Sequence, residues 1–387
     1  MRTSVFVYPW DVNGDPDAAR RIADLGAEQV TLAAAYHSTR ALTPRHPRHR
    51  VVTAEHAAVL YPAGRERWHG RVPAPYPAGD WAPGDAFGEA AAALTAAGLD
   101  VHTWVVLAHN SRLGAEHPDT SVVNAYGDRY PWAPCIAQSA TRAYLVDLAA
   151  EAATRPGARG TELESLGWYG LAHLHAHDKT AGVALGEAGQ YLMSLCFCLA
   201  CREGYGRQGL DPDALARSVR TALEPVWRGQ VPDEGGDAVE KLLGAGPAAA
   251  TRAHRDTTAQ SLQEAAVAAV RAAAGGPGFQ VLLHADPVPY HCGANVGVDP
   301  AHILSVADGV VVPCTGGAGL VTPFAAQGRG VIAANLTVVA GMGGSPGTLR
   351  ADAEAARALG AHELRLYHVG LASDADLAAV REALAVL

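Results

Sequence analysis

The sequence lacks the features that would direct the protein to a membrane or a nucleic acid. Its first twelve residues hold one arginine and a short apolar run ending in Pro-Trp-Asp, too brief for a signal-peptide core or a membrane span. The net charge is −9, and the 30 lysines and arginines are scattered without a basic run. A phosphate backbone or an anionic lipid surface therefore has no matching surface, and neither partner is expected.

Cysteine is also scarce, with six in 387 residues. That number is too small for a disulfide framework in a chain of this size, and without an export signal a reducing, cytoplasmic location is expected. Charged residues make up only 18% of the chain and apolar residues 49%, which excludes intrinsic disorder and supplies a large core. The length suits one elaborated (β/α)8 barrel, since such barrels run from about 250 residues to over about 400.

What the sequence does contain is a regular alternation of strand-like and helix-like stretches. Short apolar runs are followed by Ala- and Leu-rich stretches with helical periodicity, the pattern of a parallel sheet. The eight expected strands are residues 4–8, 29–33, 101–107, 160–166, 279–284, 309–313, 331–336 and 363–367. An open doubly wound sheet would need a glycine-rich phosphate turn after an early strand, and none is present. The prediction is an α/β protein, a single (β/α)8 TIM barrel over residues 1–387.

Two long connections interrupt this rhythm, after strands 2 and 4, and connections longer than about 15 residues usually serve function. Residues 38–79 are rich in Pro, Arg, His, Trp and Tyr and should form a lid over the mouth of the barrel. Residues 167–275 hold a histidine run, three clustered cysteines and long Ala-rich helices expected at 213–227 and 237–274. Both stretches are expected to be insertions within the one domain.

The segment SLCFCLACREGYG brings Cys196, Cys198 and Cys201 together in a C-x-C-x2-C spacing. This spacing can wrap a turn of backbone around a tetrahedral ion held by thiolates, and Cys135, before strand 4, is the expected fourth ligand. The alternative is that the four cysteines are small buried apolar side chains, which does not explain the spacing. A structural zinc ion is therefore expected, and four thiolates would leave it no open position for catalysis.

These residues resemble glycoside hydrolase family 42, the β-galactosidases, and related barrel proteins of the same clan. In that family a cysteine before strand 4 and a C-x-C-x2-C segment after it bind zinc, and the strand between them ends in an acid/base glutamate. Cys135, Glu164 in GTELESLGWYG, and CFCLAC followed by Tyr205 reproduce that order over residues 135–206. The family's nucleophilic glutamate at the end of strand 7 has no counterpart, since this sequence reads VIAANLTVVAGMGG there. The resemblance thus implies the barrel, the zinc and the acid/base, and does not extend to the nucleophile.

Polar side chains follow almost every expected strand at its C-terminal end, where the active sites of such barrels lie. The expected catalytic carboxylates are Glu164, as proton donor, and Asp286 after strand 5, as general base or stabiliser of positive charge on the substrate. Glu162 is expected instead to pair with a buried arginine inside the barrel. The residues expected to contact substrate are Trp10, Asp11, His37, His109, Asn110, His175, His177, Lys179, His284, Asn335, Tyr367 and His368.

The run HLHAHDK places His173, His175 and His177 on one face of an extended segment. Such a run can bind a metal, but more often it is a hydrogen-bonding loop over an active site. Tryptophans and tyrosines near the mouth and in the lid suit the apolar faces of sugar rings, and core packing is the competing explanation.

The function expected from these patterns is a carbohydrate-active, glycosidase-like hydrolase acting on a small sugar or an oligosaccharide. Two alternatives stay open. One is a metal-dependent sugar isomerase, epimerase or aldolase, because strand 7 offers no obvious nucleophile. The other is a barrel that binds a sugar without turning it over. Whether the chain forms a homo-oligomer is also open.

Overall fold

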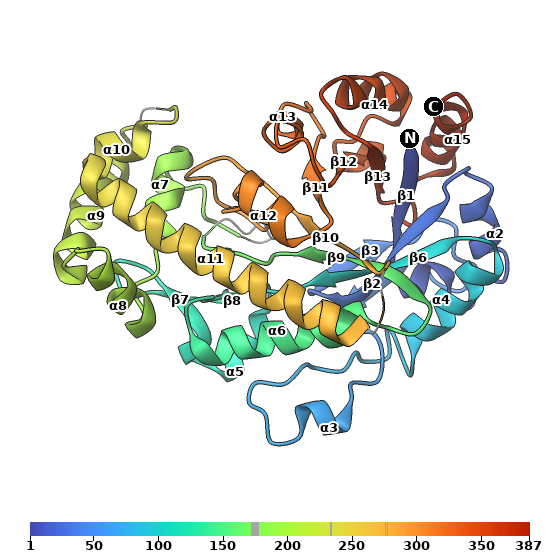
Figure 1. The fold of residues 1–387 in the computed structure, drawn as a ribbon, viewed down its shortest axis with the longest axis horizontal. Helices are drawn as coiled ribbons and strands as arrows, with labels where there is room; N and C mark the ends of the chain where they lie inside the picture. Colours follow the sequence, from blue (N-terminus) through green and yellow to red (C-terminus); the bar gives the residue numbers. More distant parts are fainter. Residues whose placement is uncertain (172–177, 233, 275, 277) are drawn as a thin grey trace.

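Eight parallel strands close into a barrel in the computed structural model, which describes residues 1–171, 178–232, 234–274, 276 and 278–387. The strands are β1 (Arg2–Val7), β2 (Gln29–Tyr36), β6 (Asp100–Val106), β9 (Ala158–Glu164), β10 (Gln280–His284), β11 (Gly309–Pro313), β12 (Val331–Thr337) and β13 (Glu363–Tyr367). Each strand pairs with the next, and β1 pairs with both β2 and β13, which closes the sheet (Figure 1). All eight expected strands and the (β/α)8 fold are confirmed.

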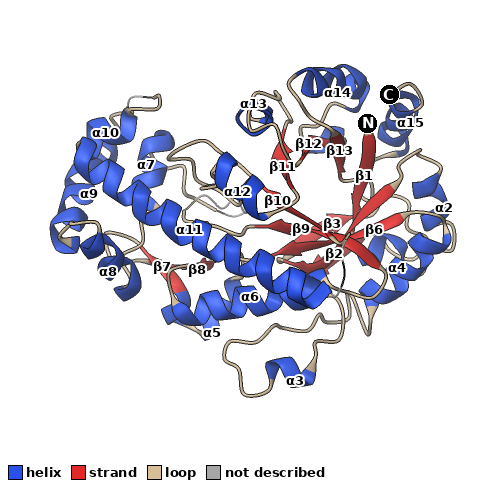
Figure 2. Ribbon diagram, viewed as in Figure 1, coloured by secondary structure: helices blue, strands red, loops and turns tan. Residues whose placement is uncertain are grey.

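Helices cover the outside of this barrel (Figure 2). Those that follow barrel strands are α1 (Pro9–Val12), α2 (Ala18–Ala23), α4 (Ala86–Ala96), α6 (Ser139–Ala153), α12 (Pro300–Val306), α13 (Val321–Ala325), α14 (Leu349–Ala358) and α15 (Asp374–Leu384). In α4 the buried Phe87, Ala90, Ala91 and Leu94 recur at helical spacing, so one stripe of the helix packs on the barrel. Asp85 begins that helix by accepting a hydrogen bond from the backbone N–H of Gly88. Short 3-10 turns at Ala340–Met342 and Pro346–Thr348 follow β12.

A buried ion pair crosses the interior of the barrel. The carboxylate of Glu162 forms a salt bridge with the guanidinium of Arg365, and neither side chain is exposed to solvent. Thr31 donates a hydrogen bond of 3.0 Å to the same carboxylate, and His284 lies 3.4 Å away. Burial by itself would raise the pKa of Glu162, but Arg365 and His284 hold it at about 2. The expected pairing of Glu162 with a buried arginine is confirmed.

The connection after β2 is made of two different parts. The hairpin of β3 (Thr39–Leu42) and β4 (Val51–Ala54) is followed by β5 (Ala58–Val59), which adds an antiparallel strand beside β2. The chain then runs through α3 (Arg65–Trp68), where Trp68 Nε1 donates a 2.7 Å hydrogen bond to Glu151 of α6. Because Trp68 packs on an outer helix, this part of the connection lies against the wall of the barrel, and the lid remains a prediction for the hairpin.

The connection after β9 builds a helical group beside the barrel. It consists of α7 (Gly186–Met193), α8 (Leu199–Arg207), α9 (Pro212–Trp227), α10 (Ala238–Leu243) and α11 (Ala245–Ala274). Helices α7 to α10 gather at the end of the molecule opposite α14 and α15, and α11 runs back alongside α6 (Figure 1). The helix expected at 237–274 is interrupted at Gly244, whose φ of +84° is accessible to glycine but ends the right-handed helix.

A further hairpin between β6 and α6 was not expected from the sequence. After α5 (Ser111–Glu116) and a 3-10 turn (Pro118–Thr120), β7 (Ser121–Val123) pairs with β8 (Arg129–Pro134), and Cys135 follows directly. Among the described residues, every helix is too short or too polar to cross a lipid bilayer.

Candidate functional site

Glu164 is the last residue of β9, so its side chain lies at the C-terminal end of the barrel. Trp104, on the neighbouring strand β6, donates a hydrogen bond of 2.6 Å from Nε1 to Oε2 of Glu164. Trp104 is 1% exposed, whereas Glu164 is partly open to solvent. In the described part of the chain Oε1 accepts no hydrogen bond, which leaves it available to a ligand. Trp104 is therefore the side chain that holds the Glu164 carboxylate.

Three tyrosines lie at this end of the barrel, with Tyr36 and Tyr367 ending β2 and β13 near the carboxylate and Tyr8 directly following β1. The hydroxyl of Tyr8 donates a hydrogen bond of 3.0 Å to that of Tyr36, and Tyr367 lies beside both. Burial raises the pKa of all three phenols, and the negative charge of Glu164 raises those of Tyr36 and Tyr367 further. At neutral pH the tyrosines are therefore uncharged and can donate hydrogen bonds to hydroxyl or carboxylate oxygens.

Two histidines and a further tyrosine continue the ring of side chains around Glu164. The ring of His37 stacks on Tyr36 with centroids 4.2 Å apart, and His109 stacks on Tyr169 at 4.5 Å. The two histidine rings are 4.7 Å from each other. Burial lowers the pKa of His37, so its imidazole is neutral at physiological pH. The expected residues His37 and His109 are thus brought together beside the carboxylate.

Trp10, Asp11 and His368 all contact Tyr8. Tyr8 stacks on Trp10 at 4.5 Å and on His368 at 4.2 Å, and its backbone N–H donates a hydrogen bond of 2.8 Å to Asp11. Burial lowers the pKa of His368 to about 3 and raises that of Asp11 to about 7. Gly370 is needed here, because a Cβ at that position would overlap the Asp11 carboxylate. In this conformation the three residues support Tyr8, and their contact with substrate stays a prediction.

The remaining strand-end residues have varied surroundings. His284 is almost fully buried and contacts the carboxylate of Glu162. Asn110 caps α5 by accepting a hydrogen bond of 2.9 Å from the backbone N–H of Leu113. Asn335 lies on β12 with its buried Oδ1 atom lacking a hydrogen-bond partner in the described structure.

The segment around the histidine run is only partly described. Lys179 is exposed in the connection that follows β9. His173, His175 and His177 lie outside the described residues, and the predictions made for them are not tested.

Asp286 lies in the connection after β10, the strand that pairs with β9. Its Oδ1 accepts a hydrogen bond of 2.9 Å from the backbone N–H of Val288, and its Oδ2 lies 2.8 Å from Nδ1 of His291. This contact raises the pKa of His291. Asn295 ties the same loop to β9, because its Oδ1 accepts a hydrogen bond of 3.0 Å from the backbone N–H of Ser165. The loop that carries Asp286 is thereby fixed to the residue after Glu164.

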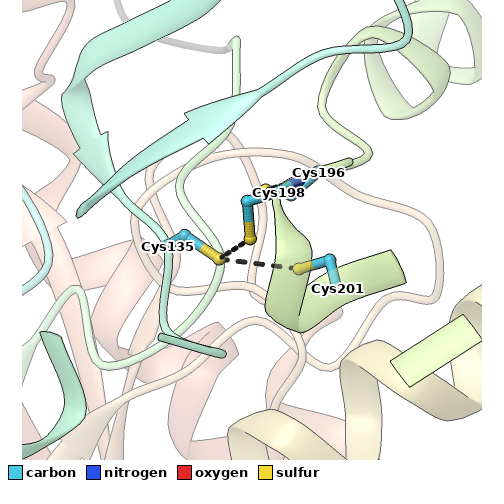
Figure 3. A group of neighbouring side chains, drawn as sticks. All are labelled: Cys135, Cys196, Cys198 and Cys201. Carbon is cyan, nitrogen blue, oxygen red and sulfur yellow. Dashed lines mark hydrogen bonds between the residues drawn. The ribbon is translucent and has the colours of Figure 1, made fainter. Parts of the chain in front are cut away.

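The four expected cysteine ligands come together in one buried cluster (Figure 3). Sγ of Cys135 lies 3.6 Å from that of Cys198 and 3.5 Å from that of Cys201, and all four sulfurs lie within 4.8 Å of one another. A tetrahedral ion with bonds of about 2.3 Å to thiolates requires sulfurs about 3.8 Å apart, so the cluster fits such an ion. The backbone N–H groups of Val123 and Cys198 donate to the sulfur of Cys196 at 3.4 and 3.5 Å, and such contacts orient a metal-binding side chain.

Comparison with known proteins gives matches to structures and none to sequences. No protein-family model matches the chain, and no curated protein matches its sequence. Among solved structures, α-L-fucosidase isoenzyme 2 from Paenibacillus thiaminolyticus aligns with all of this chain and 49% of its own, at 13% identity and a TM-score of 0.59. The PgaB (BpsB) glycoside hydrolase domain from Bordetella bronchiseptica aligns over 99% of both chains, at 17% identity and a TM-score of 0.59.

Gan42B, a GH42 β-galactosidase, aligns with all of this chain and 56% of its own, at 12% identity and a TM-score of 0.57. The chain therefore spans about half the length of the fucosidase and of the galactosidase. At these identities the likeness shows the fold alone. The resemblance to family 42 is confirmed at the level of the (β/α)8 barrel, which is shared with several glycoside hydrolases.

Proposed function

We propose that the protein is a glycoside hydrolase in which Glu164 donates a proton to the oxygen of the leaving group. The observation that carries this proposal is the arrangement of the Glu164 carboxylate at the end of a barrel strand. One oxygen accepts a hydrogen bond of 2.6 Å from Trp104, and no other described residue forms a hydrogen bond to the carboxylate. The carboxylate lies close enough to Tyr36, His37 and Tyr367 for its charge to raise their pKa values. A fixed carboxyl with one oxygen available to the ligand suits proton transfer to a glycosidic oxygen. The fold that this chain shares with glycoside hydrolases supports the same proposal.

Asp286 is proposed as the second carboxylate. Protonation of the leaving oxygen weakens the glycosidic bond, and positive charge then develops on the sugar ring, where a nearby carboxylate stabilises it or activates a water molecule. Asp286 is suited to either role because it is part of a loop fixed to β9 through Asn295 and Ser165. Its Oδ2 lies 2.8 Å from Nδ1 of His291, and this contact holds the carboxylate in place and raises the pKa of His291.

The substrate proposed is a small sugar or an oligosaccharide. The hydroxyl groups of Tyr8, Tyr36 and Tyr367 and the imidazoles of His37 and His109 supply donors and acceptors around Glu164 for sugar hydroxyls. Aromatic faces in the same ring of side chains suit the apolar faces of a pyranose.

The cysteine cluster is proposed to hold one structural zinc ion. The ion would join the chain just after β8, through Cys135, to the start of α8, through Cys198 and Cys201. Four thiolates complete its coordination, so it would stabilise the connection after β9 and take no part in the reaction. Since none of the six cysteines forms a disulfide, we place the protein in a reducing compartment such as the cytoplasm.

The proposal is tested by activity measurements on a panel of aryl glycosides with different sugars. Glu164→Gln should lower kcat by about 100-fold or more on any substrate that the wild type cleaves, and Asp286→Asn should lower it similarly. The matched control is Glu354→Gln, which changes an exposed carboxylate on α14 and should leave kcat unaltered. Full activity in Glu164→Gln, or a requirement for a chelator-labile metal other than the cysteine-bound ion, would contradict the assignment.

A further inference from the structure

Arg255 is a buried cation whose hydrogen-bonding capacity is not used. It lies on α11 with 6% of its surface exposed, and both of its η nitrogens are buried without a hydrogen-bond partner among the described residues. The guanidinium lies over the ring of Tyr191, 4.9 Å from the centroid, and over that of Trp168 at 5.5 Å. These rings offer cation–π contacts but no acceptor oxygen, and a desolvated charge is costly unless it is also hydrogen-bonded.

Arg255 is one of the residues that line a cavity of about 130 Å³, which we call the Arg255 cavity. Its walls come from the connection after β9, from α7, from α11 and from the connection after β10, and include Trp168, Tyr191, Tyr290 and His291. A space of about 10–15 Å³ holds one water molecule, so this cavity accepts a group of several heavy atoms. The cavity therefore combines aromatic walls with an arginine whose η nitrogens have no hydrogen-bond partner among the described residues.

The carboxylates around the cavity do not supply hydrogen-bond acceptors for the η nitrogens of Arg255. Asp256 accepts a hydrogen bond of 3.3 Å from Nε of Arg252, and Asp299 caps α12 by accepting one of 2.7 Å from the backbone N–H of His302. Both acids are thus engaged with other groups, and the charge left without hydrogen bonds is that of Arg255. A planar guanidinium binds carboxylate and phosphate oxygens through paired hydrogen bonds, so the missing partner is an oxyanion.

The cavity also adjoins the site described above. His291 lines it and contacts Asp286 at 2.8 Å, and the same loop is joined to β9 through Asn295. A group bound in this cavity would consequently lie beside His291, the residue that contacts the carboxylate assigned as the second catalytic group.

We propose that the Arg255 cavity is a subsite for a negatively charged substituent, a carboxylate or a phosphate, carried by a sugar. Only the statement that a sugar carries the anion rests on the proposed function. The anion would satisfy the η nitrogens of Arg255 and pack against Tyr191 and Trp168, and a neutral sugar would leave those donors unpaired. The substrate class is accordingly a uronic acid or a sugar phosphate, and the two are distinguished by experiment.

Calorimetric titration with glucuronate, glucose 6-phosphate and glucose tests the proposal on the full chain. Hydrogen bonds to a charged group account for about tenfold or more in affinity, so at least one acidic sugar should bind about tenfold more tightly than glucose. A preference for glucuronate identifies a carboxylate as the partner, and a preference for glucose 6-phosphate identifies a phosphate. If neither acid binds more tightly than glucose, the proposal is wrong.

The variant Arg255→Met tests whether Arg255 causes the preference for the acidic sugar over glucose. Because the guanidinium has no hydrogen bonds to lose, the variant should stay folded, which circular dichroism checks, and its preference for the acidic sugar should vanish. Arg255→Lys keeps the positive charge and should retain part of the preference for the acidic sugar. The matched control is Arg271→Met, which changes an exposed arginine near the other end of α11 that pairs with Asp308, and should bind as the wild type does. A preference retained in Arg255→Met would overturn the proposal.

Repeating the titrations in Glu164→Gln separates this inference from the proposed function. Whatever that variant does to sugar binding overall, its preference for the acidic sugar over glucose should persist, because Glu164 does not line the Arg255 cavity. Arg255-dependent binding in a protein that hydrolyses no glycoside would refute the hydrolase and leave the anion subsite standing, whereas hydrolysis without acid preference would refute only the subsite.

Discussion

Replacing Arg365 by methionine should destabilise the barrel strongly. Arg365 is fully buried and contacts two carboxylates, through its salt bridge with Glu162 and at 2.9 Å from Glu363. Removing one partner of a buried ion pair costs about 3–5 kcal/mol, because the opposite charge remains without compensation. The pKa of Glu162 gives a similar value, since the difference between its ordinary 4.5 and about 2 corresponds to about 3 kcal/mol.

The loss should also depend on pH in a defined direction. In the wild type the pKa of Glu162 is lower in the folded than in the unfolded chain, so its stabilisation is complete above about pH 4.5 and is lost as the pH falls towards about 2. In Arg365→Met, burial acts on Glu162 without the arginine and raises the pKa above the unfolded value. The variant should therefore become more stable as the pH falls from about 7 to about 5. Over the same range Glu162 should change the free energy of unfolding of the wild type very little.

Urea unfolding followed by tryptophan fluorescence measures both effects. The exposed pair of Arg271 and Asp308 supplies the control, since Arg271→Met should cost at most about 1 kcal/mol at either pH. The double variant Glu162→Gln/Arg365→Met should show less pH dependence than Arg365→Met. A deficit below about 1 kcal/mol at pH 7, or one that is unchanged at pH 5, would refute the electrostatic account of the barrel interior.

Three further outcomes are expected. Burial raises the pKa of Asp11 to about 7, so the contribution of Asp11 to the stability of the fold decreases as the pH rises from about 4 through 7. Asp11→Asn should therefore have the same Tm as the wild type near pH 4 and a higher Tm near pH 8. A difference in Tm that does not change with pH would contradict this. Cys196→Ser should lose the bound zinc, measured by plasma mass spectrometry, and unfold several degrees earlier, whereas Cys314→Ser should keep the metal. Trp104→Phe keeps a ring but removes the donor to Glu164, so kcat should fall about tenfold or more; unchanged kcat would show that the contact is dispensable.

The barrel could be predicted from the sequence because each unit carries its own signal. Apolar runs such as that of β10 are bounded by turns and followed by helical periodicity, and eight repeats fix the architecture. The cysteine cluster was predictable for a similar reason, since three ligands lie within six residues and only Cys135 had to be brought in from elsewhere. Local breaks were harder to predict, because Gly244 lies between two Ala-rich helical stretches and the backbone conformation that separates them leaves little trace in composition.

The side chains that organise the site depend on contacts between strands, which the sequence does not display. Trp104 is paired with Glu162 in the register of β6 against β9, and its indole Nε1 nevertheless donates to Glu164, two residues further along β9. His291 had no strand-end position to mark it, although it lies five residues after Asp286. Arg255 resembles any surface arginine of an Ala-rich helix, and only the packing of α11 against α7 and the loop after β10 reveals that it is buried.

The role of Glu164 as proton donor is tested most directly by how the effect of Glu164→Gln depends on the leaving group. For a sugar that the wild type hydrolyses, kcat/KM would be measured with a phenyl glycoside, which needs protonation, and a 2,4-dinitrophenyl glycoside, which departs without it. If Glu164 is the proton donor, kcat/KM of Glu164→Gln should fall by about 100-fold or more on the phenyl substrate and by much less on the dinitrophenyl substrate. Equal losses on both substrates, or no loss on either, would contradict it.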